Sequence, residues 1–256
     1  AALAAVLSAA GVGSVDLVDG GRVEPWDVAP GGIPAEHIGD RRDAAGRGAV
    51  RRAAPGPRQV PRSIAHGETR ATADRRAAGG GAAVTVLAPR DGLGAYAPDE
   101  AEARRLVAAG VPHLYTGVLE GTGVVGPLVL PGRTACGECV GLRLADGDPA
   151  WPRMLAQLRS GRRTAVPACD IALATTVAGL AAAHVLAHLD GRVPPSLGAR
   201  AELSLGLLST RVRALPGDGR CGCGAGSAPD EDKPSRRAPT DGPFDRTAVR
   251  RGTMAM

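Results

Sequence analysis

The chain has 256 residues, 44% of them hydrophobic, which excludes a globally disordered protein and supports a domain with a buried core. Its net charge is +5, carried almost entirely by arginine because Lys233 is the only lysine. Only 2% of the residues are aromatic, so base-stacking surface is nearly absent and we expect no nucleic-acid partner.

The first part of the chain predicts a helix, a strand and a long loop. Residues 1–13 are an apolar run that ends at a glycine, as helices commonly do. Residues 14–19 predict a short apolar strand with an acidic end. Residues 20–40 are rich in proline and predict a loop, and the basic segment 41–54 predicts a short helix.

The middle of the chain alternates strands with a helix. Residues 84–87 predict a buried strand, and residues 112–118 and 126–130 predict two more. Residues 99–109 predict an amphipathic helix with acidic residues early and arginines late, the arrangement that the helix dipole favours. This pattern indicates an α/β domain.

The last part predicts a tight turn at residues 136–143, helices over 148–158 and 169–189, and a strand over 203–212. The apolar stretch within the second helix is nearly long enough to cross a membrane, but it is rich in Ala and Thr and carries two histidines. We therefore expect a buried helix and no membrane contact. Residues 226–256 are polar and rich in proline, which predicts a disordered tail.

Five cysteines provide the strongest chemical signal. An odd number in a chain of this length is not typical of a disulfide framework, so we expect a reducing, cytoplasmic location. Two close pairs with intervening glycines have the spacing of a structural zinc site with four thiolates. The alternative is two unrelated pairs of reduced thiols. The predicted ligands are Cys136, Cys139, Cys221 and Cys223.

Three further side chains have a structural and a functional interpretation. Cys169 precedes a predicted helix, a position that lowers a thiol pKa, but we favour a small apolar role at a helix start. His184 and His188 stand four residues apart on one helix, as metal ligands often do. Because no third ligand is evident, we favour ordinary core or surface histidines.

The order of several short motifs resembles the ThiF/MoeB superfamily of adenylyltransferases, which activate ubiquitin-like proteins. The motifs are Ala10–Gly13, Val15–Asp19, Val23–Glu24 and Ile38–Gly39, followed by Val111–Leu114, Gly123–Leu130 and the first cysteine pair. The resemblance covers residues 1–225 and is closest to divergent actinobacterial-type members associated with modified-peptide biosynthesis. Family members often carry a zinc site of this kind.

The resemblance implies a Rossmann-like α/β fold, with a twisted, mostly parallel sheet, helices on both faces and a zinc knuckle at one end. The ThiF-type domain would span residues 1–225. In the family, a first strand and a glycine-rich phosphate loop precede the segment that matches Ala1, so the chain is expected to be clipped at its N-terminus.

The resemblance also implies a nucleotide site. Asp19 would bind the ATP ribose, and the alternative is an aspartate that only caps a loop. Arg41 and Arg42 would meet the phosphates, although we favour a solvent-exposed start of a helix for these two residues. Asp91 would help to bind magnesium. Arg42 stands nearest to the lysine of the family and Asp27 replaces an asparagine. Residues 30–32, Pro-Gly-Gly, replace an arginine-glutamine pair, so the expected active site is degenerate.

Two functions follow from this resemblance. The first is ATP-dependent adenylylation of the C-terminal carboxylate of a protein or peptide, with magnesium as cofactor and slow chemistry because ligands are replaced. The alternative is a non-catalytic scaffold that binds a leader peptide or a partner enzyme. The family also allows a homodimer.

Overall fold

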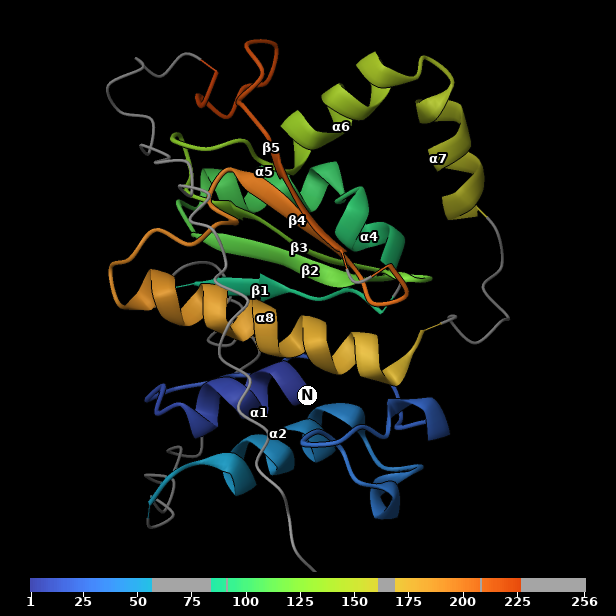
Figure 1. Cartoon of the computed structure of the whole chain (residues 1–256), viewed down its shortest axis with the longest axis vertical. Helices are drawn as coiled ribbons and strands as arrows, with labels where there is room; N and C mark the ends of the chain where they lie inside the picture. The colour runs from blue at the N-terminus through green and yellow to red at the C-terminus, as the bar shows by residue number, and fades with distance from the viewer. Residues whose placement is uncertain (57–83, 91, 161–168, 208, 227–256) are drawn as a thin grey trace, which may run out of the picture.

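A sheet of five strands forms the centre of the protein, and helices cover both of its faces (Figure 1). The computed structural model describes residues 1–56, 84–90, 92–160, 169–207 and 209–226, and all structural statements refer to these. The predicted tail therefore lies almost wholly outside the described residues. The helices are α1 (Ala2–Ala9), α2 (Arg42–Ala53), α4 (Gly92–Tyr96), α5 (Glu100–Ala108), α6 (Gly137–Gly147), α7 (Trp151–Ser160) and α8 (Ile171–Leu189).

The strands follow one another in the sheet in chain order. They are β1 (Thr85–Leu87), β2 (His113–Leu119), β3 (Thr122–Val129), β4 (Ala199–Ser204) and β5 (Ser209–Ala214). Only β1 and β2 are parallel, and the other three neighbouring pairs are antiparallel. The prediction of a mostly parallel sheet is wrong for the described strands, although the α/β class and the helices on both faces are confirmed.

Connection length explains the antiparallel pairs. The turn between β2 and β3 is only Glu120 and Gly121, and the short turn between β4 and β5 contains residues 205–207. Such short turns join antiparallel strands, whereas a parallel pair needs a long crossover. The β1–β2 connection contains α4 and α5 and is the crossover of this sheet.

Three local predictions are wrong. Residues 14–19 have no regular secondary structure and belong to no strand of the described sheet, and Val15 packs against the core cluster instead. The single strand expected over 203–212 is the hairpin of β4 and β5. The tight turn expected at 136–143 is the beginning of α6, which continues to Gly147.

The helices predicted in the first, middle and later parts of the chain are confirmed. Helix α5 begins as expected, because the Asp99 side chain accepts a hydrogen bond from the backbone N–H of Glu102 at 2.9 Å. Helix α1 ends before Gly11, whose φ of 89° suits glycine. Two short 3₁₀ turns, Pro25–Asp27 and Ala35–His37, interrupt the predicted loop.

The largest core cluster lies between the sheet and α8. Leu114 and Leu128 from the sheet pack with Leu173 and Val177 from α8, and Leu7 of α1 joins them. By length and composition α8 is apolar enough to cross a membrane, but it lies between the sheet on one side and α1 on the other (Figure 1). Apolar side chains of α8 thus pack in the core.

Gly123 of β3 permits the close approach of α8, which leads to a prediction. A Cβ atom at this position would lie 2.3 Å from Cγ2 of Val177. We expect Gly123→Ala to lower the free energy of unfolding by about 1–3 kcal/mol through overpacking, as measured by chemical denaturation. Gly121→Ala is the control, since its Cβ would meet no atom within 4 Å. Equal stability of the two variants would contradict the packing.

Candidate functional site: a cysteine cluster and an arginine–carboxylate network

The four cysteines of the two predicted pairs converge on the face of the sheet opposite α8. Cys136 is the N-cap residue of α6, and Cys139 lies in the first turn of that helix. Cys221 and Cys223 come from the loop after β5. Three of the four side chains are buried, and Cys223 is half-buried. The α6 helix and the loop thus bring together residues more than eighty positions apart.

The distances between the sulfur atoms fit a tetrahedral metal site. The Sγ atoms of Cys136 and Cys139 are 3.9 Å apart, those of Cys136 and Cys221 3.6 Å, and those of Cys139 and Cys223 3.6 Å. All four ligand atoms lie within 4.8 Å of one another. Four zinc–sulfur bonds of about 2.3 Å at tetrahedral angles require sulfurs about 3.8 Å apart. The cluster could therefore hold one metal ion.

The pKa values of the clustered thiols are consistent with a metal site. Burial raises the pKa of the Cys221 thiol to about 12. A hydrogen bond from Cys136 lowers the pKa of Cys139 to about 5, and the Asp218 N–H also donates to its sulfur at 3.4 Å. Without a cation, several buried sulfurs this close cannot all ionise, because their charges repel one another. A divalent metal would supply the compensating charge.

The loop that carries the second pair is closed at its base. A Cβ atom on Gly217 would lie 2.5 Å from the carbonyl carbon of Ala225, so only glycine allows the two ends of the loop to touch. Arg220 at the tip donates to Asp146 of α6 and to Asp218 of the loop. These ion pairs fix the loop against α6 and hold the pKa of Asp218 low, at about 2.

A second group of charged residues surrounds Arg42, at the beginning of α2. Its Nε atom lies 3.2 Å from Oδ1 of Asp19, and its Nη1 atom donates to Oδ2 of Asp27 at 3.1 Å. The guanidinium also donates to the Gly20 carbonyl. The sequence analysis assigned Asp19 and Arg42 to one nucleotide site without predicting a contact between them, and the structure brings the two side chains together. We call the group of Asp19, Glu24, Asp27, Arg42 and Arg90 the arginine–carboxylate network.

Asp27 is the most buried carboxylate of this network, with a side chain 9% exposed. Burial alone would raise its pKa, but hydrogen bonds from the Glu24 backbone N–H and from Arg90, with the charge of Arg42, hold it below its usual value. Arg90 also lies 3.6 Å from the Glu24 carboxylate. Both arginines are therefore already paired with carboxylates.

A hollow of about 350 Å³ adjoins the network. It is lined by Asp19, Gly20, Gly21, Arg22, Arg41 and Asp43. Arg41 lines this hollow, and its Nη2 atom pairs with Asp43 at 3.0 Å. The side chains of Arg41 and Arg47 hold the pKa of the Asp43 carboxyl well below its usual range. The hollow is thus lined by the Asp19 carboxylate and by two arginines, of which Arg41 is paired with Asp43.

The other predicted site residues have different outcomes. Asp91 lies outside the described residues, so its proposed role with magnesium is untested. Sequence reasoning missed Arg90 and Glu24, although Arg90 follows β1, where a functional residue was expected. Cys169 is exposed, and burial with the charge of Asp170 raises its thiol pKa. His184 is buried in α8, and the described residues place it in no metal-binding group.

The ThiF family model matches residues 1–223. E. coli MccB crystallised with ATP has a TM-score of 0.63 and 17% identity over 87% of this chain and 62% of that chain. E. coli MccB with MccA-N7isoASN has a TM-score of 0.64 and 18% identity over 88% and 63% of the two chains.

The microcin C7 biosynthetic enzyme MccB, in complex with N-formylated MccA, is equally similar. It has a TM-score of 0.64 and 18% identity over 87% of this chain and 63% of that chain. The present chain thus spans less than two thirds of the MccB chains that it matches. No curated protein matched it significantly. At these identities, the likeness to solved structures concerns the fold.

Proposed function

The chain belongs to the ThiF family, and we propose that it is an ATP-dependent adenylyltransferase that activates the C-terminal carboxylate of a peptide. The observation that carries this proposal is the pairing of Asp19 with Arg42, 3.2 Å apart, beside a hollow of about 350 Å³. A carboxylate at this position can accept the ribose hydroxyls of ATP. MccB, which shares the fold, has been crystallised with ATP and with N-formylated MccA.

In this reaction the peptide carboxylate oxygen attacks the α-phosphorus of ATP. The bond to the bridging oxygen breaks, pyrophosphate leaves and an acyl-adenylate forms. Catalysis of such a transfer depends on positioning and on neutralising negative charge. Arg42 and Arg90 are the cations in place for this role, and guanidinium groups bind phosphate oxygens with two parallel hydrogen bonds. Magnesium is proposed as the accompanying ion.

The four-cysteine cluster is proposed to bind zinc in a structural role. All four positions of a tetrahedral site would be filled by thiolates, which leaves none open for substrate or water. Zinc would tie the loop after β5 to the beginning of α6. The ThiF-type domain is accordingly proposed to span residues 1–225, while the homodimer, the cytoplasmic location and the absence of nucleic-acid and membrane partners stay predictions.

A specific observation favours a second function, that of a non-catalytic scaffold for a leader peptide or partner enzyme. Asp27, which stands where the family has an asparagine, accepts hydrogen bonds from both Arg42 and Arg90. In this state neither guanidinium is free to meet a triphosphate. In a catalytic protein ATP would have to compete with Asp27, which agrees with slow adenylylation.

Asp27→Asn separates these two functions. Removing the negative charge weakens the hydrogen bonds that Arg42 and Arg90 donate to residue 27, while the side chain keeps its shape. We expect pyrophosphate–ATP exchange to rise roughly tenfold, since hydrogen bonds between charged groups are worth about 1.5–3 kcal/mol. Asp40→Asn, in the same loop, is the matched control and should leave the rate unchanged. Exchange that stays at background in both variants would favour the scaffold.

A further inference from the structure

The strand β5 lies at one edge of the sheet, and its outer side has no neighbouring strand in the described part of the chain (Figure 1). Residues 210–214 are all exposed, so both faces of this strand are open to solvent. Among the described elements, β5 has extensive contacts with β4 alone. An edge of this kind carries unpaired backbone groups with which another extended chain can pair.

The pairing of β5 with β4 shows which backbone groups point outward. Leu215 donates to the carbonyl of Gly198, which lies opposite it in the register, at 2.9 Å. In an antiparallel pair, residues that bond to the partner strand alternate with residues that do not. Residues 211 and 213 therefore bond inward to β4, as Leu215 does. The N–H and C=O groups that point outward are those of Thr210, Val212 and Ala214.

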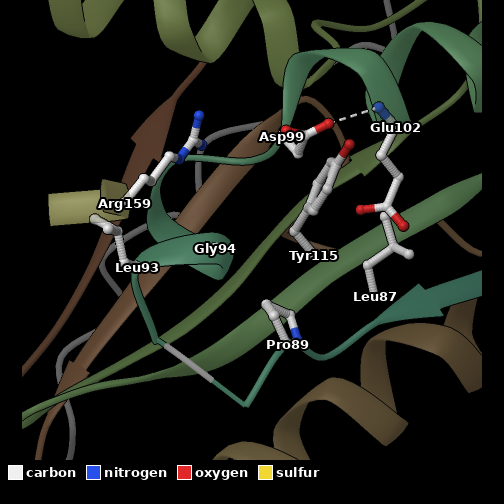
Figure 2. A pocket seen from close by; sticks show the side chains of 8 residues that line it. All are labelled: Leu87, Pro89, Leu93, Gly94, Asp99, Glu102, Tyr115 and Arg159. Carbon is white, nitrogen blue, oxygen red and sulfur yellow. Dashed lines mark hydrogen bonds between the residues drawn. The ribbon is translucent and has the colours of Figure 1, made fainter. Parts of the chain in front are cut away.

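The open edge is separate from the hollows of the molecule. Strand β5 contributes no residue to the hollow beside Asp19, nor to a second cavity of about 200 Å³ near the carboxyl end of β1. The second cavity is lined by residues of β1, α4, α5, β2 and α7 (Figure 2). A partner of β5 is therefore not enclosed, and its affinity comes from backbone pairing and from side chains on the two faces of the strand.

One face of β5 carries an excess of positive charge. Arg211 and Arg213 lie on the same face as Arg200 and Glu202, their partners in β4. Glu202 accepts a hydrogen bond from Arg200 at 3.2 Å and lies 3.3 Å from Nε of Arg213, so two arginines share this carboxylate. Arg211 forms no ion pair with a described residue. Because side chains on one face repeat every second residue, this face favours acidic residues at alternate positions of an added strand.

The opposite face of β5 is less polar. Val212, which is 51% exposed, lies on it between Thr210 and Ala214. The neighbouring Ala201 and Leu203 of β4 belong to the core under α8 or pack against it. The other side chains of an added strand would thus meet methyl groups, which suits valine and other β-branched residues.

The arginines of β5 disfavour a second copy of this chain at the edge. An antiparallel pair of two β5 strands centred on Val212 would place Arg211 of each copy opposite Arg213 of the other. Like charges directly opposite each other destabilise a strand pair, whereas opposite charges stabilise it. The charges of β5 therefore favour an acidic partner.

We propose that the open edge of β5 binds an extended, acidic segment of another polypeptide by strand addition. The segment pairs its backbone with residues 210–214, places acidic side chains opposite Arg211 and Arg213, and places apolar side chains beside Val212. This interaction goes beyond adenylylation and does not depend on it, because β5 contributes no residue to the hollow beside Asp19.

Two labelled peptides with blocked ends test the charge preference, one alternating glutamate with valine and the other lysine with valine. About seven residues suffice to span β5 at about 3.3 Å per residue. Fluorescence polarisation at low ionic strength measures their binding to the full chain, because salt screens exposed charges. We expect the glutamate peptide to bind at least about tenfold more tightly, since opposite charges across strands stabilise and like charges destabilise the pair.

Arg211→Ser combined with Arg213→Ser should reduce this ratio to below about three, because both cations are lost. Arg51→Ser combined with Arg52→Ser is the matched control, since it removes the same charge from exposed positions of α2. The control should keep the full preference for glutamate. Equal binding of the two peptides, or a preference that survives the loss of Arg211 and Arg213, would overturn the proposal.

Hydrogen exchange measured by NMR identifies strand addition. With the glutamate peptide at about ten times its Kd, the N–H groups of Thr210, Val212 and Ala214 should exchange roughly tenfold more slowly, because only about a tenth of the chain is then free. The N–H groups of residues 211 and 213 should change little, since they already bond to β4. Absence of protection at the three outward N–H groups at millimolar concentrations of this peptide would overturn the proposal.

Val212→Pro removes one outward N–H group and no bond to β4, a change that edge strands tolerate. It should weaken binding of the glutamate peptide by about 3- to 10-fold, the worth of one hydrogen bond, while thermal unfolding stays unchanged. Wild-type binding in this variant would contradict backbone pairing. Self-association of the chain that Val212→Pro abolishes would assign the edge to a second copy and overturn the proposal.

Discussion

Replacement of Cys139 by serine is expected to abolish metal binding and to lower the melting temperature by roughly 20–40 °C. Structural zinc contributes on the order of 10 kcal/mol in small zinc-binding peptides, and each kcal/mol corresponds to about 2–4 °C in a domain of this size. Cys139 contacts the sulfurs of Cys136 and Cys223 and accepts from the Asp218 N–H, so its loss affects both halves of the cluster.

Metal content by elemental analysis and thermal unfolding measure this effect together. Cys169→Ser is the matched control, because this exposed cysteine lies outside the cluster, and it should change neither quantity. Wild-type protein should contain one zinc per chain. A wild-type chain that lacks zinc and yet unfolds at the same temperature as after zinc addition would contradict the structural role.

Replacement of Asp19 by alanine is expected to weaken ATP binding by about 10- to 100-fold. Hydrogen bonds to a charged group contribute about 1.5–3 kcal/mol, and the ribose would lose its carboxylate acceptor. Asp19 is partly exposed, at 33%, so the variant should fold normally. Titration calorimetry with ATP and magnesium measures the affinity, and thermal unfolding verifies the fold.

Asp16→Ala provides the control for this variant. Asp16 is exposed in the same segment and lies outside the hollow. It should bind ATP as tightly as the wild type. If both variants bind ATP equally, the nucleotide does not use Asp19 and the proposed position of the ribose is wrong.

The sequence predicted features that depend on near neighbours. Helix α5 was predicted because its charges follow the helix dipole, which is a property of adjacent residues. The structure adds that Asp99 caps this helix. The cysteine cluster was predicted because the spacing within each pair is local. The structure adds that α6 and the closed loop at Gly217 bring the pairs together.

Features that depend on distant or ambiguous segments were not predicted. The β4–β5 turn contains Leu205 and Leu207 beside Gly206. Because these residues are apolar, the composition of this segment does not predict a turn. Arg90 donates to Asp27, which lies 63 positions away in the sequence, and no local sequence pattern predicts a contact over this separation. The mostly parallel sheet followed from the family resemblance, whereas the short connections along β2–β3 and β4–β5 impose antiparallel pairs.

Peptide-dependent pyrophosphate–ATP exchange tests adenylylation most directly. Labelled pyrophosphate is incubated with the full chain, magnesium, ATP and hexapeptide pools that end in a free carboxylate or in an amide. The predicted result is slow incorporation of label into ATP with the free carboxylate only, because the amide cannot form an acyl-adenylate. Absence of label with peptides that calorimetry shows to be bound, or equal label with both pools, would contradict adenylyl transfer to a peptide carboxylate.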